Sequence, residues 1–336
     1  MKALITGAGG FIGSFLLEAW TGRGDEARVL FLPGENAEAA EKRGAEIFRG
    51  DLTRPETLKG IGDGVEIVFH LAARVVDWGS KKVFSRIMVD GTRNLLEAAG
   101  QIDRFVYFSS IAALGFGRDL VGLDEDAVRK PCGVPYSDTK MEAEDLVTDF
   151  CRSRQIAYTI IRPANVTGPK SVWVTDIIDA FMRGPLPLIA GGKTPGSFVY
   201  IDNLVDGILL AAEADIARNR TYHFRDDYTL DWKTYLEALG ALVEKKPAGN
   251  IPFSVAWGLG AIMERLLTPL GVRPPMTRLA AGVMGKNNDV NVTRARTELG
   301  WKTRITEDAA MSEIKDWVTR VYLPSKNGPT PSPPGP

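Results

Sequence analysis

Short apolar runs alternate with longer amphipathic segments through the first half of the chain. The short runs have the length and composition of strands, and the longer segments repeat apolar positions at helical spacing. The expected strands cover residues 2–6, 27–32, 46–49, 66–71, 104–109 and 158–162. One expected helix begins near Phe11, and two more cover residues 83–99 and 137–154. This alternation predicts a doubly wound α/β fold, in which helices cover both faces of a parallel sheet.

The second half of the chain is less regular and has fewer strands. An apolar strand is expected at residues 198–201. The expected helices cover residues 175–182, 203–214, 231–242, 253–267 and 306–321. This pattern predicts a smaller, mostly helical part added to the sheet. Residues 324–336 are mostly Pro, Gly, Ser and Thr, so we expect them to form a disordered tail.

Three glycines stand between the first strand and the first helix. Gly7 permits a tight turn, Gly10 lets a pyrophosphate approach the backbone, and Gly13 lets the helix pack closely on the sheet. The start of the helix, at Phe11 and Ile12, supplies free N–H groups and the positive end of a dipole. The turn therefore predicts a dinucleotide site of Rossmann type. The alternative, a structural turn with no ligand, is disfavoured by the strand-turn-helix context.

The end of the second strand bears on the choice between NAD and NADP. Glu35 follows this strand and could reach a ribose hydroxyl, although a solvated loop glutamate is the commoner case. No arginine follows immediately to bind a 2′-phosphate. Both cofactors stay open.

The glycine turn also suggests how the chain is divided. We expect residues 1–170 to form a dinucleotide-binding domain, with returns to its sheet from about 198 to 224. Residues 171–323 would form an interleaved substrate-binding part.

Composition excludes several classes of protein. The chain has 336 residues, of which 25% are charged and 44% hydrophobic, and its net charge is -1, which is typical of a globular protein. This balance provides no general field for nucleic acid, so no such partner is expected. His70, His223, Cys132 and Cys151 are the only histidines and cysteines. They are too few for a three-histidine metal site, a zinc ribbon or a disulfide framework, so no metal is expected. A Ser-His-Asp hydrolase would have to use one of the two histidines.

The same counts bear on location. Two isolated cysteines suggest a reducing compartment, so we expect the protein to be cytoplasmic. The apolar stretch 3–17 contains four glycines, which is unusual for a signal peptide. No run of 18 apolar residues occurs, so no transmembrane helix is expected.

A tyrosine and a lysine stand four positions apart at the start of the helix that follows the fifth strand. Tyr136 and Lys140 would share one face of this helix. Free tyrosine is a weak base at neutral pH because its pKa is about 10, and a nearby cation lowers that pKa. Ser109 and Ser110 end the fifth strand, where a hydroxyl could hold a substrate oxygen. An exposed helix pair with no chemistry is the alternative.

Six motifs, taken together in this order, resemble those of the extended short-chain dehydrogenase/reductases. They are Thr6–Gly13, Gly50–Leu52, His70–Ala73, Ser109–Ser110, Tyr136–Lys140 and Arg162–Pro169. The resemblance covers the chain to about residue 215. It implies a catalytic triad of Ser110, Tyr136 and Lys140. Ser110 is preferred to Ser109 because the family serine stands five positions before a glycine, here Gly115.

The resemblance also implies a set of cofactor contacts. Asp51 and Leu52 would contact the adenine, and Ala72 and Ala73 would border the ribose. Pro163, Asn165 and Val166 would lie behind the nicotinamide ring. In one departure from the family pattern, Met88 stands where an asparagine is common, so a polar contact is lost there. We expect His70 to pack or to form a hydrogen bond near the cofactor.

Three local features distinguish the reactions that this family performs. The apolar residues Ile111–Ala113 replace the carboxylate pair that a sugar dehydratase needs. Gly196 stands where sugar-nucleotide enzymes commonly carry an arginine for the phosphates, although Asn165 is compatible with an epimerase. The apolar loop residues Val76, Trp78 and Trp173 are expected substrate contacts, with simple packing as the alternative.

A looser resemblance points to the 3β-hydroxysteroid dehydrogenase and 3-ketone reductase branch. It is carried by Asp77–Gly79, Phe198–Asn203, Ile251–Gly271 and Arg273–Arg278. It implies an NAD(P)-dependent oxidoreductase that interconverts a secondary alcohol and a ketone on an apolar sterol, terpenoid or β-keto acid. A sugar-nucleotide epimerase with tightly bound NAD is the alternative, and a non-catalytic dinucleotide-binding protein ranks last. Family members often form homodimers.

The segment 251–263 carries no charged residue. It is too short to span a bilayer. We expect a core helix of the substrate-binding part. The alternative is a lid, or a helix in weak peripheral contact with a membrane surface.

Overall fold

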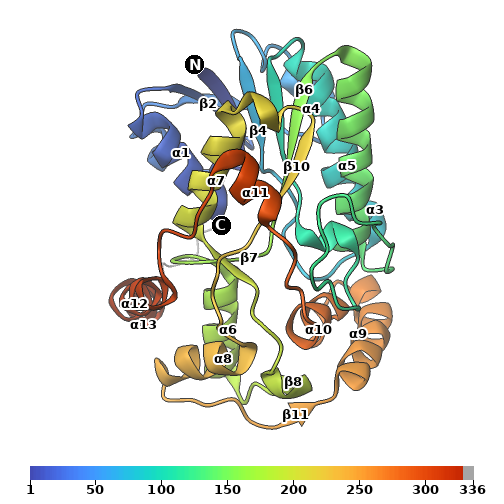
Figure 1. Ribbon diagram of the computed structural model, residues 1–336, viewed down its shortest axis with the longest axis vertical. Coiled ribbons are helices and arrows are strands. Elements are labelled where there is room, and N and C mark those ends of the chain that lie inside the picture. The colour runs from blue at the N-terminus through green and yellow to red at the C-terminus, as the bar shows by residue number, and fades with distance from the viewer. Residues whose placement is uncertain (328–336) are drawn as a thin grey trace, which may run out of the picture.

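The computed structural model describes residues 1–327, and its largest element is a parallel sheet of seven strands (Figure 1). The strand order is β10-β6-β5-β4-β1-β2-β3, and every neighbouring pair is parallel. The strands are β1 (Lys2–Thr6), β2 (Glu26–Phe31), β3 (Glu46–Arg49), β4 (Ile67–His70), β5 (Arg104–Phe108), β6 (Ala157–Pro163) and β10 (Arg220–Phe224). The predicted fold class is confirmed.

Helices cover both faces of this sheet (Figure 1). One face carries α1 (Phe11–Gly22), α7 (Ile201–Glu213) and α11 (Thr293–Leu299), and the other carries α4 (Gly91–Ala99) and α5 (Pro135–Arg154). Successive strand residues enter two separate buried clusters: Ile5 and Phe69 lie in one, while Leu4 and Val68 lie in the other. Burial on both faces explains why these strands are continuous apolar runs rather than alternating ones.

The lower part of the molecule in Figure 1 is mostly helical. It contains α6 (Val172–Arg183), α8 (Trp232–Ala241), α9 (Phe253–Leu267), α10 (Arg278–Gly285) and the strand pair β8 (Leu188–Ile189) and β11 (Asn250–Ile251). A second pair, β7 (Asn165–Thr167) and β9 (Phe198–Tyr200), lies below the large sheet. The remaining helices are α2 (Glu38–Glu41), α3 (Lys81–Ser85), α12 (Glu307–Trp317) and α13 (Leu323–Asn327).

The helix expected at 83–99 is divided by a π-helical turn. Helix α3 leads into the π-helical residues Arg86–Asp90 and then into α4. Met88 is buried in this turn, where its sulfur accepts a hydrogen bond from the Thr139 hydroxyl and its carbonyl accepts one from Thr92. The methionine that replaces the family asparagine therefore packs against α5.

The second half of the chain differs more from expectation. Strand β10 was not assigned as a strand, although a return to the sheet was expected in this region. It pairs with β6 at the sheet edge, and its residues Tyr222, His223 and Phe224 are buried. Helices α10 and α11 were also not predicted, since each has eight residues or fewer and so shows little helical periodicity.

The expected disordered tail begins too early. Residues 324–327 belong to α13, and Asp179 on α6 accepts hydrogen bonds from Tyr322 and Lys326. The prediction is wrong for these residues, because contacts with α6 outweigh the local composition. The rest of the predicted tail, 328–336, lies outside the described residues. Within residues 1–327, no helix is long and apolar enough to cross a membrane.

Candidate active site

The glycine turn forms a cradle at the carboxyl end of β1. Gly7 has a φ of +74°, and a β-carbon there would lie 2.8 Å from the Ala72 nitrogen. A β-carbon on Gly13 would lie 2.1 Å from the Gly7 carbonyl oxygen, so the turn has no room for one. Gly10 caps α1 without a side chain, and the first turn of α1 carries no acid. The N–H groups at Phe11 and Ile12 therefore meet no competing side chain, which fits a phosphate group.

His70 closes the floor of this cradle. Its Nδ1 lies 2.8 Å from the Thr6 hydroxyl and its Nε2 lies 2.9 Å from the Thr92 hydroxyl, so both ring nitrogens are satisfied. Burial lowers the pKa of His70 to about 3, with a smaller contribution from the Lys140 charge. Because both of its ring nitrogens are hydrogen-bonded, the neutral imidazole links Thr6, just before the glycine turn, to Thr92 in α4. It does not transfer protons at neutral pH.

Tyr136 and Ser110 meet at the carboxyl end of β5. The Ser110 side chain lies close enough to Tyr136 to lower the pKa of its phenol, and the Ser110 hydroxyl accepts a hydrogen bond from the Ala112 N–H at 3.1 Å. The ring of Tyr136 packs edge-on against Phe84 at 6.4 Å. Ser109 makes no such contact, because its hydroxyl is buried without a hydrogen-bond partner. This geometry supports the choice of Ser110 over Ser109.

The pKa of Tyr136 differs from the expected direction. Burial raises it to about 12, and the neighbouring Ser110 hydroxyl only partly offsets this effect. The expectation that Lys140 lowers this pKa is not met by the described residues. Tyr136 therefore keeps its proton at neutral pH and is a proton donor there.

Lys140 is buried one helical turn beyond Tyr136. Its ammonium donates a hydrogen bond to the Phe108 carbonyl and lies 5.2 Å from the centre of the Tyr107 ring. Burial lowers the pKa of Lys140 to about 8, and the Glu144 charge opposes that shift. With this pKa, Lys140 is mostly charged at neutral pH. The Glu144 carboxylate, one further turn along α5, favours the charged form.

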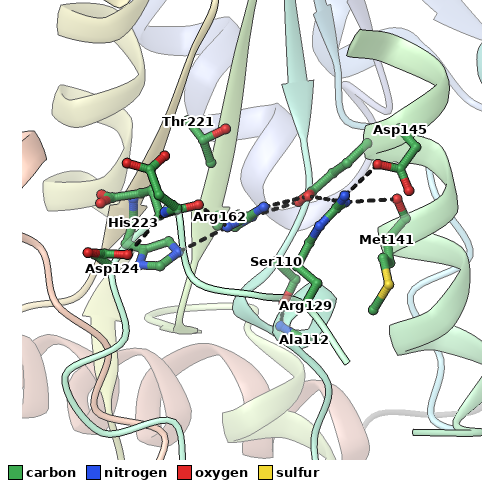
Figure 2. A network of polar contacts seen from close by, with 12 residues as sticks. Ser110, Ala112, Asp124, Arg129, Met141, Asp145, Arg162, Thr221 and His223 are labelled. Carbon is green, nitrogen blue, oxygen red and sulfur yellow. Dashed lines mark hydrogen bonds and ion pairs between the residues drawn. The ribbon is translucent and has the colours of Figure 1, made fainter. Parts of the chain in front are cut away.

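Glu144 is buried and is the centre of an ion network. Its carboxylate accepts two hydrogen bonds from Arg162, at 2.8 and 2.7 Å, and one from Arg129 at 3.1 Å. Figure 2 shows Arg162 between His223 on one side and Arg129 on the other. Since Arg162 lies near the end of β6, the network fixes α5, which carries Tyr136 and Lys140, to this strand of the sheet.

The predicted adenine and nicotinamide contacts are engaged in local structure. Asp51 accepts hydrogen bonds from the backbone and hydroxyl of Thr53, and Leu52 is buried. Asn165 donates to the Gly196 carbonyl at 2.7 Å, which ties β7 to the segment before β9. Pro163 ends β6, and Val166 is buried in β7.

The loop after β4 runs from the cofactor side toward the lower part of the molecule. Ala72 donates its N–H to the Thr6 hydroxyl, and Ala73 follows it, half-buried. Further along, Asp77 pairs with Arg273 at 3.1 Å and accepts a hydrogen bond from Thr277. Two of the four segments that carried the looser resemblance, Asp77–Gly79 and Arg273–Arg278, are therefore in contact, although almost 200 positions separate them in the chain.

The three expected substrate contacts lie in different places. Val76 and Trp78 are half-buried in the loop after β4. Trp173 instead begins α6 and packs edge-on against Trp232 at 5.4 Å, in the core of the lower part. Its surroundings support the packing alternative.

Comparison with known proteins identifies the family. Residues 3–223 match the NAD dependent epimerase/dehydratase family. The chain belongs to this family. A ketoreductase of Stigmatella aurantiaca, which acts on a farnesyl dihydroquinoline oxide, is 31% identical and covers 94% of this chain and 96% of its own. A 2-alkyl-3-oxoalkanoate reductase of Stenotrophomonas maltophilia is 29% identical and covers 94% and 98%.

Solved structures agree on the fold of this epimerase/dehydratase-family chain. A UDP-glucose 4-epimerase of Thermus thermophilus, crystallised with NAD, superposes with a TM-score of 0.74 at 21% identity and covers 96% of this chain and 100% of its own. The protein is an NAD(P)-dependent enzyme of the extended short-chain dehydrogenase/reductase type.

Its residues fit the dinucleotide. The glycine cradle leaves room for a phosphate, and the uncapped start of α1 offers N–H donors to it. The buried Lys140 provides a cation. Glu35 lies beside Gly9, and Arg49 donates hydrogen bonds to the carbonyls of Leu32 and Glu35. A carboxylate and a guanidinium thus both border the end of β2, so NAD and NADP stay open.

Two groups of the site were not predicted from the sequence. The first is Glu144, whose signal was an acid four positions after Lys140 together with an arginine before Pro163. The second is Arg278 at the start of α10, which donates to the Gly133 carbonyl just before Tyr136 and pairs with Glu264 on α9. No local pattern distinguishes Arg278, because its partners are distant in the chain.

Proposed function

We propose that the protein reduces a ketone to a secondary alcohol, or catalyses the reverse oxidation, on an apolar substrate. The proximity of Ser110 to Tyr136, one helical turn before the buried Lys140, carries this proposal. The ketoreductase and 3-oxoalkanoate reductase activities of the two relatives support it. Sterols, terpenoids and β-keto acids are the substrate classes that we consider.

In this mechanism, Ser110 and Tyr136 hold the substrate carbonyl oxygen. Tyr136 keeps its proton at neutral pH and can give it to that oxygen as negative charge develops there. Lys140, which is mostly charged below about pH 8, stabilises the resulting phenolate. When bound, the nicotinamide supplies or accepts the hydride.

Two observations disfavour the other reactions of the family. Residues Ile111–Ala113 are buried beside Ser110 and carry no group that could transfer a proton, as a dehydratase would require. A β-carbon on Gly196 would lie 2.0 Å from the Phe198 ring, so a phosphate-binding side chain has no room there. Sugar-nucleotide epimerisation therefore lacks its usual anchor.

The function is tested with Tyr136→Phe. We expect turnover of ketones with NADH or NADPH to fall about 10²–10⁴-fold, while the dissociation constant of the cofactor changes little. Stopped-flow absorbance and fluorescence titration measure the two quantities. Full activity in this variant would refute the assignment, and interconversion of UDP-sugars without net cofactor consumption would favour an epimerase.

We also propose that α9 contacts a lipid surface. Val255, Leu259, Ile262 and Leu266 are exposed and share one face of this helix. The only exposed charged side chain of α9 is Arg265, because Glu264 is paired with Arg278. An apolar stripe with one cation and no free acid suits anionic lipid.

Vesicle binding tests this contact. Co-sedimentation with vesicles of phosphatidylcholine and phosphatidylglycerol should be lost in an Ile262→Glu, Leu266→Glu double variant and kept in Ile216→Glu, an exposed apolar position elsewhere. A change in mass on size-exclusion chromatography, without vesicle binding, would instead indicate a homodimer through this face. The cytoplasmic location stays a prediction.

A further inference from the structure

One arginine near the active site has no partner. Arg74 stands in the loop after β4 and is half-buried. Within residues 1–327 it forms no ion pair and donates no side-chain hydrogen bond, and its Nε is fully buried without an acceptor. Burying part of a guanidinium without an acceptor is costly, so this arrangement calls for an anion that the protein itself does not supply.

Other arginines show that this is unusual for the fold. Every other buried or half-buried arginine in residues 1–327 donates at least one hydrogen bond to a carbonyl or carboxylate oxygen. These are Arg28, Arg104, Arg118, Arg129, Arg162, Arg225, Arg278 and Arg294. Arg118 also has a buried Nε without an acceptor, but its Nη2 donates to the Leu114 carbonyl. Among the buried and half-buried arginines of residues 1–327, Arg74 alone donates no side-chain hydrogen bond.

The nearest acid in the sequence is already engaged. Asp77, three positions after Arg74, pairs with Arg273 and accepts a hydrogen bond from Thr277. Arg273 also pairs with Asp176, which holds the Asp77 pair on the lower part of the molecule. Asp77 forms its ion pair with Arg273 and not with Arg74.

Aromatic packing places Arg74 on the catalytic side of the loop. Its guanidinium carbon lies 5.6 Å from the centre of the Phe84 ring, and the same ring packs edge-on against Tyr136 at 6.4 Å. A β-carbon on Gly79 would lie 3.5 Å from Nε and Nη2 of Arg74, so the loop folds over the guanidinium. Arg74 is thus held one aromatic ring away from the catalytic phenol.

We propose that Arg74 binds a carboxylate of the substrate and selects apolar acids over neutral ketones and alcohols. The planar guanidinium fork matches a carboxylate in two parallel hydrogen bonds. Val75, Val76 and Trp78, on the same loop, would contact the apolar part. The proposal rests on the function proposed above and assigns its substrate class.

A matched pair of substrates tests it. 3-Hydroxydecanoate and its methyl ester share the same chain and hydroxyl group and differ in the negative charge and one added methyl group. The hydroxy acid avoids the spontaneous decarboxylation of β-keto acids. Full-length protein is assayed with each compound and NAD⁺ or NADP⁺. We expect Arg74→Gln to lower kcat/KM for the acid about 10–100-fold, mainly through KM, and to leave the ester and the cofactor KM unchanged.

Two further variants complete the test. Arg74→Lys should restore part of the preference for the acid, because it keeps the charge but loses the fork. Arg86→Gln is the matched control, since Arg86 is an exposed arginine next to α3, and it should change neither substrate. Binding is measured independently by calorimetric titration of the NADH-loaded protein with 3-hydroxydecanoate and with the ester.

The outcomes separate this proposal from the proposed function. Equal losses for acid and ester in Arg74→Gln would overturn it in favour of a structural role. A raised KM for the cofactor alone would overturn it in favour of a cofactor phosphate. Normal turnover of the ester without preference for the acid would refute the carboxylate site alone. Absence of turnover, together with tight, Arg74-dependent binding of the acid, would refute the function alone.

Discussion

The two sides of the active site treat charge in opposite ways. On the α5 side, Glu144 is bonded by Arg162 and Arg129, and Lys140 donates to a carbonyl. On the side of the loop after β4, Arg74 has no acceptor and Val75 is 60% exposed. The first side is complete within the protein, and the second offers an unsatisfied cation and apolar surface.

The difference separates two tasks. Groups that transfer or stabilise a proton must be held in one geometry, and a closed network of charges achieves this. Groups that select a substrate need free hydrogen-bonding capacity, which costs stability until the ligand arrives. Removing a charge should therefore have opposite effects on stability on the two sides.

The largest effect is expected on the network side, in Glu144→Gln. The change leaves Arg162 buried without its counter-charge, and we expect a loss of about 3–5 kcal/mol in the free energy of unfolding. Urea titration followed by circular dichroism measures it. Glu142→Gln, on the same helix with an exposed partner at Lys81, should cost less than about 1 kcal/mol. Equal effects in both variants would remove the contrast between the two sides.

The next effect is sensitivity to acid. Burial lowers the pKa of both His70 and His223 to about 3, so the folded state keeps them neutral while the unfolded chain takes up protons below its pKa of about 6.5. Stability should therefore fall from about pH 6.5 downward, by about 2 kcal/mol per histidine at pH 5. Unfolding at pH 7 and pH 5 should show a smaller difference in His223→Gln. An unchanged pH dependence would contradict the neutral, buried state of His223.

The glycine cradle, like the α5 side of the active site, is held in one geometry by contacts within the protein. Gly13→Ala tests whether cofactor binding needs this geometry. The new methyl would collide with the Gly7 carbonyl, so we expect NADH to bind about 10-fold more weakly or worse. Fluorescence titration of NADH measures the change. Gly22→Ala, at the open end of the same helix, has nothing within 4 Å and should bind normally.

The smallest effect, and the one of opposite sign, is expected at Arg74. Arg74→Met removes a half-buried cation that has no partner, so the free energy of unfolding should stay the same or rise by up to about 1 kcal/mol. Thermal and urea unfolding measure it alongside Glu144→Gln. A loss of more than about 2 kcal/mol would mean that Arg74 supports the fold, and the contrast between the two sides would fail.

The sequence by itself determined six of the seven sheet strands, the glycine turn and the relative order of Ser110, Tyr136 and Lys140. These features are local: a strand is a short apolar run, the turn needs glycines at set spacings, and Tyr136 and Lys140 share a helix face. Such signals lie within a few positions of one another, so they can be recognised without knowing the rest of the fold.

Only the tertiary structure decided the partners. It brought Arg162 and Arg129 to Glu144, paired Asp77 with Arg273, placed Trp173 against Trp232, and left Arg74 without an acceptor. It also reversed the expected direction of the pKa of Tyr136, because burial outweighs the effect of the neighbouring Ser110 hydroxyl. Each of these depends on contacts between distant segments and on exclusion of water, which are properties of the packed chain and leave no local pattern in the sequence.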